Sequence, residues 1–597
     1  MTDALPAIPR PRAHGPDETR FYVEAERYLD MSLRLNPVAA TYYGYHRYDG
    51  EIDDYSPEGI RRRLAFYEEA ETLFTSIDRS RMSLGAVIDL DLILNDIRAS
   101  IFSARRLRPH ENDPGHYNEI LGYGTLFLTI LHESDPAWPV RLASLLSRMR
   151  GIPKLLSEAR GNLRNPPRVL TQFIAQQNPA TINFFRETLP KLWDRAPELR
   201  AQLEAESRKA IAALEDYQKF LEGELLARST GDWRLGGELW TEKLRHTLQS
   251  DLHPREIVER AWKRLRSERE AMLAIAEPLH ARIFPQHTHA ERGDELINVV
   301  VKEVIGEISK RHSTPETLFK DVKEKWVPRT KAFIRRAGLL TLPPDSDDFV
   351  VENTPGFLDG LAVAFFQPPP AFEPHLKKSY WISSIPKTGD PARDAGRAES
   401  FLREYNDYGL QSLTIHEALP GHYVQFWYAM NSPYASIYKK IYANNTFAEG
   451  WAVLAEEQMF ASGYADGEPE CLLIHKKINL RTPINAILDA RLHTEPMSDE
   501  QADEWALDLM QRYGFQEEAE ASGKLRRAKI TATQLSTYFV GYVELSDLVQ
   551  SWKERKGPAF SLKEFNERVL SFGTIPPRDV KRLMLEEEPV PGSAGGP

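Results

Sequence analysis

The chain has 597 residues, of which 42% are hydrophobic and 27% are charged, and its formal net charge is −11. This length is several times that of a common domain, so the chain can bury a large core and is expected to form more than one lobe. The negative charge argues against nucleic acid as a partner, because binding a polyanion requires a surplus of Lys and Arg on the contacting face.

The first residues are polar and rich in proline, so residues 1–17 are predicted to be a disordered head. They contain no apolar segment of the kind that a secretory signal or a membrane anchor needs. No other apolar run approaches the roughly 20 residues that cross a bilayer. The sequence therefore predicts a cytoplasmic protein with no membrane partner.

Between residues 18 and 340, apolar residues recur three and four positions apart, which predicts an N-terminal lobe built of helices. A long surface helix is expected from Ala201, because its apolar residues fall on one stripe between Glu and Lys. The stripe consists of Ile211, Leu214, Tyr217 and Leu221. Residues 341–587 are expected to form a second, catalytic lobe, followed by a disordered tail at residues 588–597.

A small sheet is predicted between about residues 348 and 386, where β-branched and aromatic runs alternate with prolines. The runs are VVENTP, AVAFFQPPP and SYWISSIP. An exposed edge strand just upstream of His416 could pair with an extended peptide and so hold a substrate. The alternative is a hairpin that only covers the core.

A His-Glu pair, His416 and Glu417, is followed by a second histidine, His422, six positions after the first. In the usual zinc-hydrolase spacing, H-E-x-x-H, the two histidines lie four apart on one helical face. A separation of six leaves them about 120° apart on an ideal helix, so an unbroken helix cannot direct both at one ion. Pro420 and Gly421 favour a local irregularity. We therefore predict a bulged helix that brings both histidines to one zinc ion.

A third ligand is expected from the segment TFAEGWAVLAEEQM, in which Glu449 lies on a predicted helix. Two His and one Glu leave a coordination position open for water, as a catalytic zinc site requires. The only cysteine, Cys471, excludes a zinc cluster built on cysteines. Glu456, about two turns after Glu449, could orient a ligand histidine. The alternative for Glu456 is a solvated surface carboxylate.

A later helix is predicted to begin after Ser498, because Ser498 and Gln501 have the spacing of a capping box. Its apolar residues repeat the helical spacing. They are Ala502, Trp505, Ala506 and Leu509.

These motifs resemble those of a known family. The segment H-E-A-L-P-G-H-Y-V-Q at residues 416–425 and the segment E-G-W-A at residues 449–452 are similar to H-E-x-x-P-G-H-H-x-Q and E-G-W-A of the family called domain of unknown function 885. Further similarity lies in LNPVAATYYGYHRYDGEIDDYSPE near residue 35 and in FNERVLSFGTIPP, so it covers nearly the whole chain. Single matching positions late in the chain are Arg527, Gln534, Tyr538 and Gly541.

Two positions depart from the family pattern. Tyr423 stands where the family has a second consecutive histidine, so His422 must be the second histidine ligand if a metal is bound. The family element D-x-G-x-H reads D-A-R-L-H at residues 489–493. This departure weakens any role for Asp489 and leaves His493 as a candidate catalytic residue.

The resemblance implies a mainly α-helical, zincin-like fold of the gluzincin type with a small sheet beside the active-site helix. Related zincins use Tyr and His side chains from a late helix to stabilise the oxyanion, and Tyr538 lies in the matching segment QLSTYFVGY. A buried core tyrosine is the alternative. Arg527 could bind a substrate carboxylate, and Tyr542 is a second candidate substrate-binding residue.

The leading hypothesis is a zinc metallopeptidase that cleaves short peptides. The proposed metal ligands are His416, His422 and Glu449, with Glu417 as the general base. One alternative is a zinc hydrolase of a non-peptide amide or ester, because the same chemistry serves any polarised acyl group. Another is a catalytically inactive helical binding or scaffold protein.

Overall fold

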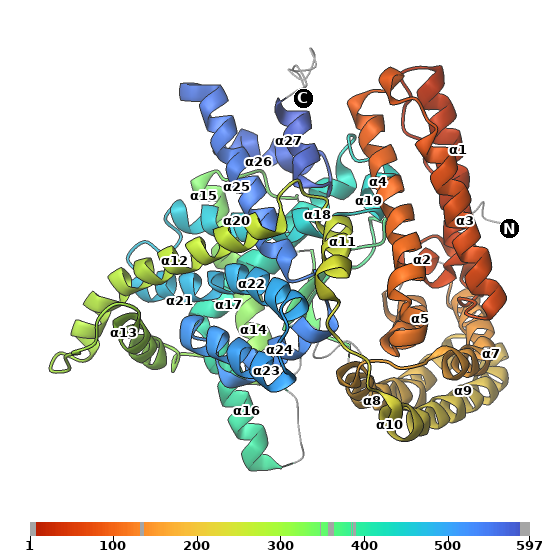
Figure 1. Ribbon diagram of the computed structural model, residues 1–597, viewed down its shortest axis with the longest axis horizontal. Helices are drawn as coiled ribbons and strands as arrows, with labels where there is room; N and C mark the ends of the chain where they lie inside the picture. The colour runs from red at the N-terminus through yellow and green to blue at the C-terminus, as the bar shows by residue number, and fades with distance from the viewer. Residues whose placement is uncertain are drawn as a thin grey trace. The chain divides into compact units, whose positions relative to one another are not determined.

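The computed structural model describes residues 8–131, 137–344, 346, 348–355, 363–383, 385 and 390–585. The described residues are mainly helical with one small three-stranded sheet, as the sequence predicts (Figure 1). Among them, no helix combines the length and the apolar character needed to cross a membrane. The expected tail at residues 588–597 and residues 1–7 of the expected head lie outside the described residues.

The chain divides into two compact units. The first unit comprises the described residues of Met1–Leu239, Glu352–Ser384 and Ser436–Ile441. The second comprises those of Trp240–Val351, Ile385–Ala435 and Tyr442–Pro597. The expected division after residue 340 would assign residues 240–340 to the first lobe, whereas here they group with the helix of His416. The reason is the packing of a long helix in this segment, α12 (Pro254–Ile283), against two helices of the second unit, α21 (Pro469–Asn479) and α22 (Arg481–Thr494).

The first unit is a set of packed helices. Tyr28 stacks on Phe66 with ring centroids 5.4 Å apart, and Tyr22 Oη donates to Asp89 Oδ2 at 2.9 Å. These contacts join α1 to α3 and α4, which are drawn in red and orange in Figure 1. The helices are α1 (Pro16–Leu35), α2 (Pro37–Tyr42), α3 (Pro57–Thr75), α4 (Leu84–Phe102), α5 (Pro109–Asn112), α6 (Gly115–Leu126), α7 (Trp138–Asn162), α8 (Arg168–Asn183), α9 (Arg200–Phe220), α10 (Leu226–Arg228) and α19 (Ile437–Ile441).

The helix predicted from Ala201 is present as α9. Leu214 and Tyr217 of its stripe are buried, and Leu221 is buried in the π-helical turn that follows. Ile211 is only half-buried, so the buried stripe lies slightly to one side of the predicted one.

The predicted sheet is present as β1 (Val350–Asn353), β2 (Ala364–Gln367) and β3 (Ser379–Ile382), in the order β1-β3-β2. β2 runs antiparallel to β3 with Phe365 opposite Trp381. Trp381 is buried in a cluster with Leu126 and Phe127. This packing anchors β3 in the core of the first unit. Pairing of an edge strand with a substrate stays a prediction.

The second unit carries every candidate site residue. Its helix at Ser498 begins with the predicted capping box, in which the Ser498 and Gln501 side chains each bond the other's backbone N–H. Besides α12, α21 and α22, the helices are α13 (Asp294–Ile308), α14 (Leu318–Asp321), α15 (Val327–Ala337), α16 (Pro391–Glu404), α17 (Asp407–Glu417), α18 (His422–Asn431), α20 (Asn445–Ala461), α23 (Asp499–Asp508), α24 (Glu518–Ile530), α25 (Ser536–Lys556), α26 (Leu562–Ser571) and α27 (Pro577–Leu585). One further helix, α11 (Gly236–Leu248), crosses the division between the units.

Short helical turns of other types supplement the α-helices. The π-helical turns are Ser103–Leu107, Phe127–Leu131, Phe184–Thr188, Leu221–Leu225, Val322–Trp326 and Leu509–Tyr513. The 3-10 helices are His46–Tyr48, Arg79–Arg81, Leu189–Arg195, Pro197–Leu199 and Gly557–Ala559.

A buried ionic network ties α16 to α21 and α22. The Glu404 carboxylate accepts hydrogen bonds from Lys477 Nζ at 2.8 Å, from Arg481 and from the backbone N–H of Glu517 at 2.9 Å. Burial raises the pKa of Glu404, but Lys477 and Arg481 outweigh burial and bring its pKa down to about 2. The carboxylate is therefore held in its charged form inside the unit.

Candidate metal centre

The segment between His416 and His422 is a complete break between two helices. α17 ends at Glu417 and α18 begins at His422, with a cis peptide bond between Leu419 and Pro420. The predicted bulge within one continuous helix is therefore wrong in form. The predicted convergence of the two histidines is present, because their ring centroids lie 4.8 Å apart with the ring planes nearly perpendicular.

Gly421 is required at this break by lack of space. A Cβ atom at position 421 would lie 1.8 Å from the carbonyl oxygen of His416 and 2.4 Å from that of Ile415. The Gly421 N–H donates to the Ile415 oxygen at 2.9 Å, and Trp451 Nε1 donates to the Pro420 oxygen at 3.1 Å. The turn is thus closed on itself and fastened to α20, which directs His422 back toward His416.

Glu449 completes a compact group of three potential ligands. Its Oε2 atom lies 3.4 Å from His416 Nε2 and 3.5 Å from His422 Nε2. One ligand atom from each residue lies within 4.8 Å of the others. The structure therefore brings together the three residues that the sequence predicts as metal ligands.

The position of Glu449 depends on very close packing of α20 against α25. A Cβ atom at Gly450 would lie 2.2 Å from the carbonyl carbon of Gly541, and a Cβ atom at Gly541 would lie 1.8 Å from the carbonyl oxygen of Thr446. Only glycine at both positions allows the two backbones to touch. The glycine of the E-G-W-A segment thus fixes where the preceding glutamate stands.

Glu456 orients His416 from the side opposite Glu449. Its Oε1 atom lies 2.8 Å from His416 Nδ1, and its carboxylate is buried. Its Oε2 atom lies 3.7 Å from His475 Nδ1, and that nitrogen lies 3.3 Å from Ser412 Oγ. The predicted contact between Glu456 and a ligand histidine is present, and the surface alternative does not hold.

His475 and Asn479 of α21 extend this support and were not predicted from the sequence. His475 stacks on Phe460 with ring centroids 3.7 Å apart, and Asn479 Nδ2 lies 3.1 Å from His475 Nε2. Their spacing of four residues on one helical face is a sequence signal for a shared environment, but only the contacts of His475 with Phe460 and Glu456 of α20 show what that face meets.

The charges within the group shift the pKa values of Glu449 and His416 in opposite directions. Burial raises the pKa of Glu449, but the two imidazoles beside it outweigh burial and hold it well below its usual range. Burial lowers the pKa of His416, but Glu449, Glu456 and Glu417 outweigh burial and hold it well above its usual range. The site is therefore built for positive charge at its centre.

Glu417 is the last residue of α17 and is buried next to His416 in the chain. Its charge contributes to the raised pKa of His416 and, after burial, to the raised pKa of Glu456. Its carboxylate is therefore close enough to His416 and Glu456 for its charge to act on both.

Tyr538 and Arg527 lie together beside His416. The Tyr538 ring is 6.4 Å from the His416 ring and tilted by 26° from it. Arg527 donates to Tyr538 Oη at 3.1 Å and to Gln534 Oε1 at 2.8 Å. Burial and the charge of Glu449 raise the pKa of Tyr538 although Arg527 opposes them, so the phenol keeps its proton.

His493 and Tyr542, which the sequence also predicts as site residues, make the following contacts. His493 is buried on α22 and its Nε2 atom lies 2.9 Å from the carbonyl oxygen of Ala528, which joins α22 to α24. The Tyr542 ring lies under the Arg264 guanidinium at 5.2 Å. Asp489, on α22, accepts hydrogen bonds from the Thr533 backbone at 2.7 Å and from Ser536, so it secures the start of α25.

The donor set fits a zinc ion. Zinc bonds to His nitrogen and carboxylate oxygen at about 2.0–2.1 Å, so neighbouring ligand atoms of a tetrahedral site stand about 3.4 Å apart. The separations of 3.4 and 3.5 Å around Glu449 Oε2 match this value. That oxygen is buried and makes no hydrogen bond among the described residues, which a bound cation would compensate.

Comparison with known proteins finds one matching family and solved structures with a similar fold. The family model described as bacterial protein of unknown function (DUF885) matches residues 37–584. A putative lipoprotein of unknown function from Shewanella oneidensis is 28% identical over 96% of this chain and 100% of that one, with a TM-score of 0.79. A putative lipoprotein from Colwellia psychrerythraea is 18% identical over 95% and 97% of the two chains, with a TM-score of 0.74. No curated protein sequence matches the chain.

The cytoplasmic location expected from the sequence is contradicted by these relatives, both of which are described as lipoproteins. The expectation depended on the absence of an apolar segment among the first residues. Such an absence carries no information on location, because the attachment of a protein to a membrane need not be encoded in the folded part of the chain.

Proposed function

Since the chain belongs to the DUF885 family, we propose that its His416–His422–Glu449 group is a zinc site that hydrolyses peptide bonds in short peptides. The observation that supports this most is the approach of both Nε2 atoms to one buried Glu449 oxygen at 3.4 and 3.5 Å. Three protein ligands leave one position of a tetrahedral zinc site for a reactant, as in catalytic sites.

A zinc ion held by His416, His422 and Glu449 would supply Lewis-acid chemistry, that is, polarisation of a carbonyl group and a lower pKa for water. Glu417 accepts the proton of the attacking water and returns it to the leaving amine. Glu456 holds His416 in a fixed orientation through Nδ1, so that Nε2 faces Glu449.

Tyr538 donates a hydrogen bond to the carbonyl oxygen of the substrate as negative charge develops on it. Its raised pKa keeps the phenol protonated for this role. Arg527 holds the phenol in place, because one guanidinium nitrogen donates to both Tyr538 Oη and Gln534 Oε1. The binding of a substrate carboxylate by Arg527 stays a prediction.

The proposal is tested by metal analysis and a peptide-library cleavage assay on the native protein and three variants. His416→Ala and Glu449→Ala are expected to lose zinc from this site, whereas Glu417→Gln is expected to keep zinc and lose activity by at least about 100-fold. Glu324→Gln, on an exposed side chain of another helix, is the matched control and is expected to behave as the native protein.

Two results would contradict the proposal. The first is a native protein whose zinc content is not reduced by either ligand substitution. The second is a zinc-loaded protein that cleaves amide or ester libraries but no peptide, which would favour hydrolysis of a non-peptide bond instead.

The description of the Shewanella oneidensis relative as a lipoprotein supports a membrane-anchored or secreted location for this chain too. Fractionation of cells that express the full-length protein tests this: recovery from the membrane or the medium supports it, and recovery from the cytosol overturns it.

A further inference from the structure

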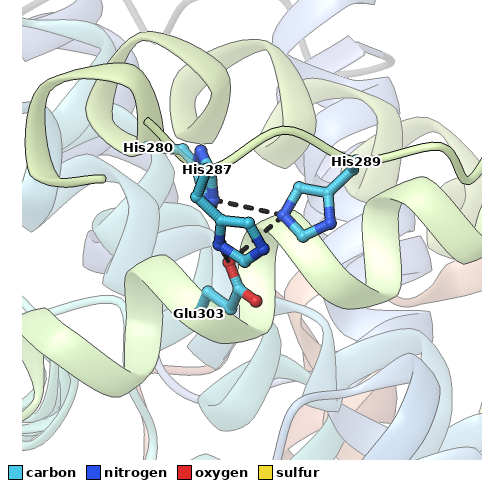
Figure 2. Close-up of side chains that lie close together, drawn as sticks. All are labelled: His280, His287, His289 and Glu303. Carbon is cyan, nitrogen blue, oxygen red and sulfur yellow. Dashed lines mark hydrogen bonds and ion pairs between the residues drawn. The ribbon is translucent and has the colours of Figure 1, made fainter. Parts of the chain in front are cut away.

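A second group of metal-binding side chains lies at the junction of α12 and α13, apart from the His416 site. His280 is in the last turn of α12, His287 and His289 are in the following loop, and Glu303 is on α13. One ligand atom from each of the four residues lies within 4.8 Å of the others. Figure 2 shows the side chains converging from these three segments.

The Glu303 Oε2 atom is the centre of the group. It lies 2.8 Å from His280 Nε2, 3.2 Å from His289 Nε2 and 3.3 Å from His287 Nδ1. His280 Nε2 and His289 Nε2 lie 3.2 Å apart. These separations are close to the edge of about 3.4 Å expected for a tetrahedral zinc site.

No placement of protons on the three histidine rings satisfies all of these contacts. Each ring nitrogen carries at most one proton, and one carboxylate oxygen offers about two lone pairs for three imidazoles. If His280 Nε2 and His289 Nε2 both donate to Glu303, two N–H groups face each other at 3.2 Å. A single cation bonded to all four ligand atoms removes this conflict.

The local backbone holds the histidines in place. Phe284 N donates to the His280 oxygen at 2.7 Å, and His287 N donates to the Phe284 oxygen at 3.0 Å. The second bond closes a four-residue turn with Pro285 at its second position, as is common in such turns. The Phe284 ring packs 5.1 Å from the His280 ring and 6.4 Å from the His287 ring.

The group has an outer partner and a path to solvent. Glu291 Oε2 lies 3.6 Å from His289 Nδ1, the nitrogen that faces away from Glu303, and so can orient that ring. The His280 side chain is only 7% exposed, whereas that of His287 is 49% exposed. A metal ion could therefore enter from the His287 side.

We propose that His280, His287, His289 and Glu303 bind a divalent first-row transition-metal ion, with zinc as the favoured ion. Three imidazoles and one carboxylate are borderline ligands that suit zinc and its neighbours better than calcium or magnesium. Four protein ligands fill a tetrahedral site, so this site is structural and fastens the loop at residues 284–293 to α12 and α13. The His416 site, with three ligands, differs in keeping one position open.

The test is a zinc titration of the native protein and of matched variants. The native protein is expected to bind two equivalents of zinc, while the double variant His287→Ala/Glu303→Gln, which keeps two of the four ligands, is expected to bind one. His287 is half-exposed, so its replacement is not expected to disturb folding. The control is His375→Ala, which changes an exposed histidine of the first unit.

A second readout is independent of metal counting and of activity. Arg292 is exposed in the same loop, and zinc is expected to slow tryptic cleavage there in the native protein and in His416→Ala, but not in the double variant His287→Ala/Glu303→Gln. An equal zinc stoichiometry for the native protein and the double variant His287→Ala/Glu303→Gln would overturn this proposal. Loss of one zinc equivalent in His416→Ala alone would also overturn this proposal, but it would leave the proposed function intact.

Discussion

Replacing Gly450 with alanine tests whether the contact of α20 with α25 sets the position of Glu449. The added Cβ atom would lie 2.2 Å from the Gly541 carbonyl carbon, whereas ordinary contacts begin at 3.4 Å. The helices must therefore separate by about 1.2 Å at this point, since 3.4 − 2.2 = 1.2. Overpacking of this kind costs about 1–3 kcal/mol, and a clash with helical backbone is expected at the upper end, about 3 kcal/mol.

The same displacement is expected to impair the metal centre. Glu449 directly precedes Gly450, so it would move away from the Nε2 atoms that it now meets at 3.4 and 3.5 Å. A misplacement of about 1 Å lowers the activity of a catalytic site by about 100-fold. Urea unfolding measures the change in stability, while competition with a chromophoric chelator and peptide cleavage measure the change at the site.

The matched control is Gly396→Ala in α16, where an added Cβ atom meets nothing within 4 Å. Alanine is the better helix former, so this variant is expected to be more stable by up to about 1 kcal/mol, with unchanged zinc affinity. Native stability and native zinc affinity in Gly450→Ala would refute the reasoning, because they would show that the backbones of α20 and α25 are not in contact.

Two further predictions concern buried carboxylates. Glu456→Gln removes the charge beside His416 Nδ1 and is expected to weaken zinc binding by about 10-fold, and unchanged affinity would contradict it. Glu404→Gln leaves Lys477 and Arg481 buried without their counter-charge and is expected to cost about 3–5 kcal/mol at neutral pH. Because the pKa of Glu404 is lowered from 4.5 to about 2, its contribution is present above pH 4.5 and lost as the pH falls toward 2. Unfolding measured between pH 6 and pH 2 should therefore show the difference between native and variant proteins shrinking, and a constant difference would refute it.

The sequence by itself determined the elements whose signals are local. The capping box at Ser498, the helix from Ala201 and the three strands follow from turn chemistry and hydrophobic period, which act between near neighbours in the chain. The Pro420–Gly421 pair likewise predicted an interrupted path between His416 and His422. Its form, a full break instead of a bulge, involves a hydrogen bond from Trp451 of α20 to the Pro420 carbonyl oxygen.

Only the tertiary structure decided which distant side chains meet. Glu449 reaches the histidines because Gly450 and Gly541 bring two helices into backbone contact, and Gly541 lies far along the chain. The His280 group was missed for the same reason. His287 and His289 are a visible pair in the sequence, but Glu303 joins them only through the packing of α13 on α12. Residue type can be read from a sequence, whereas convergence on one point depends on contacts between segments that the sequence does not place side by side.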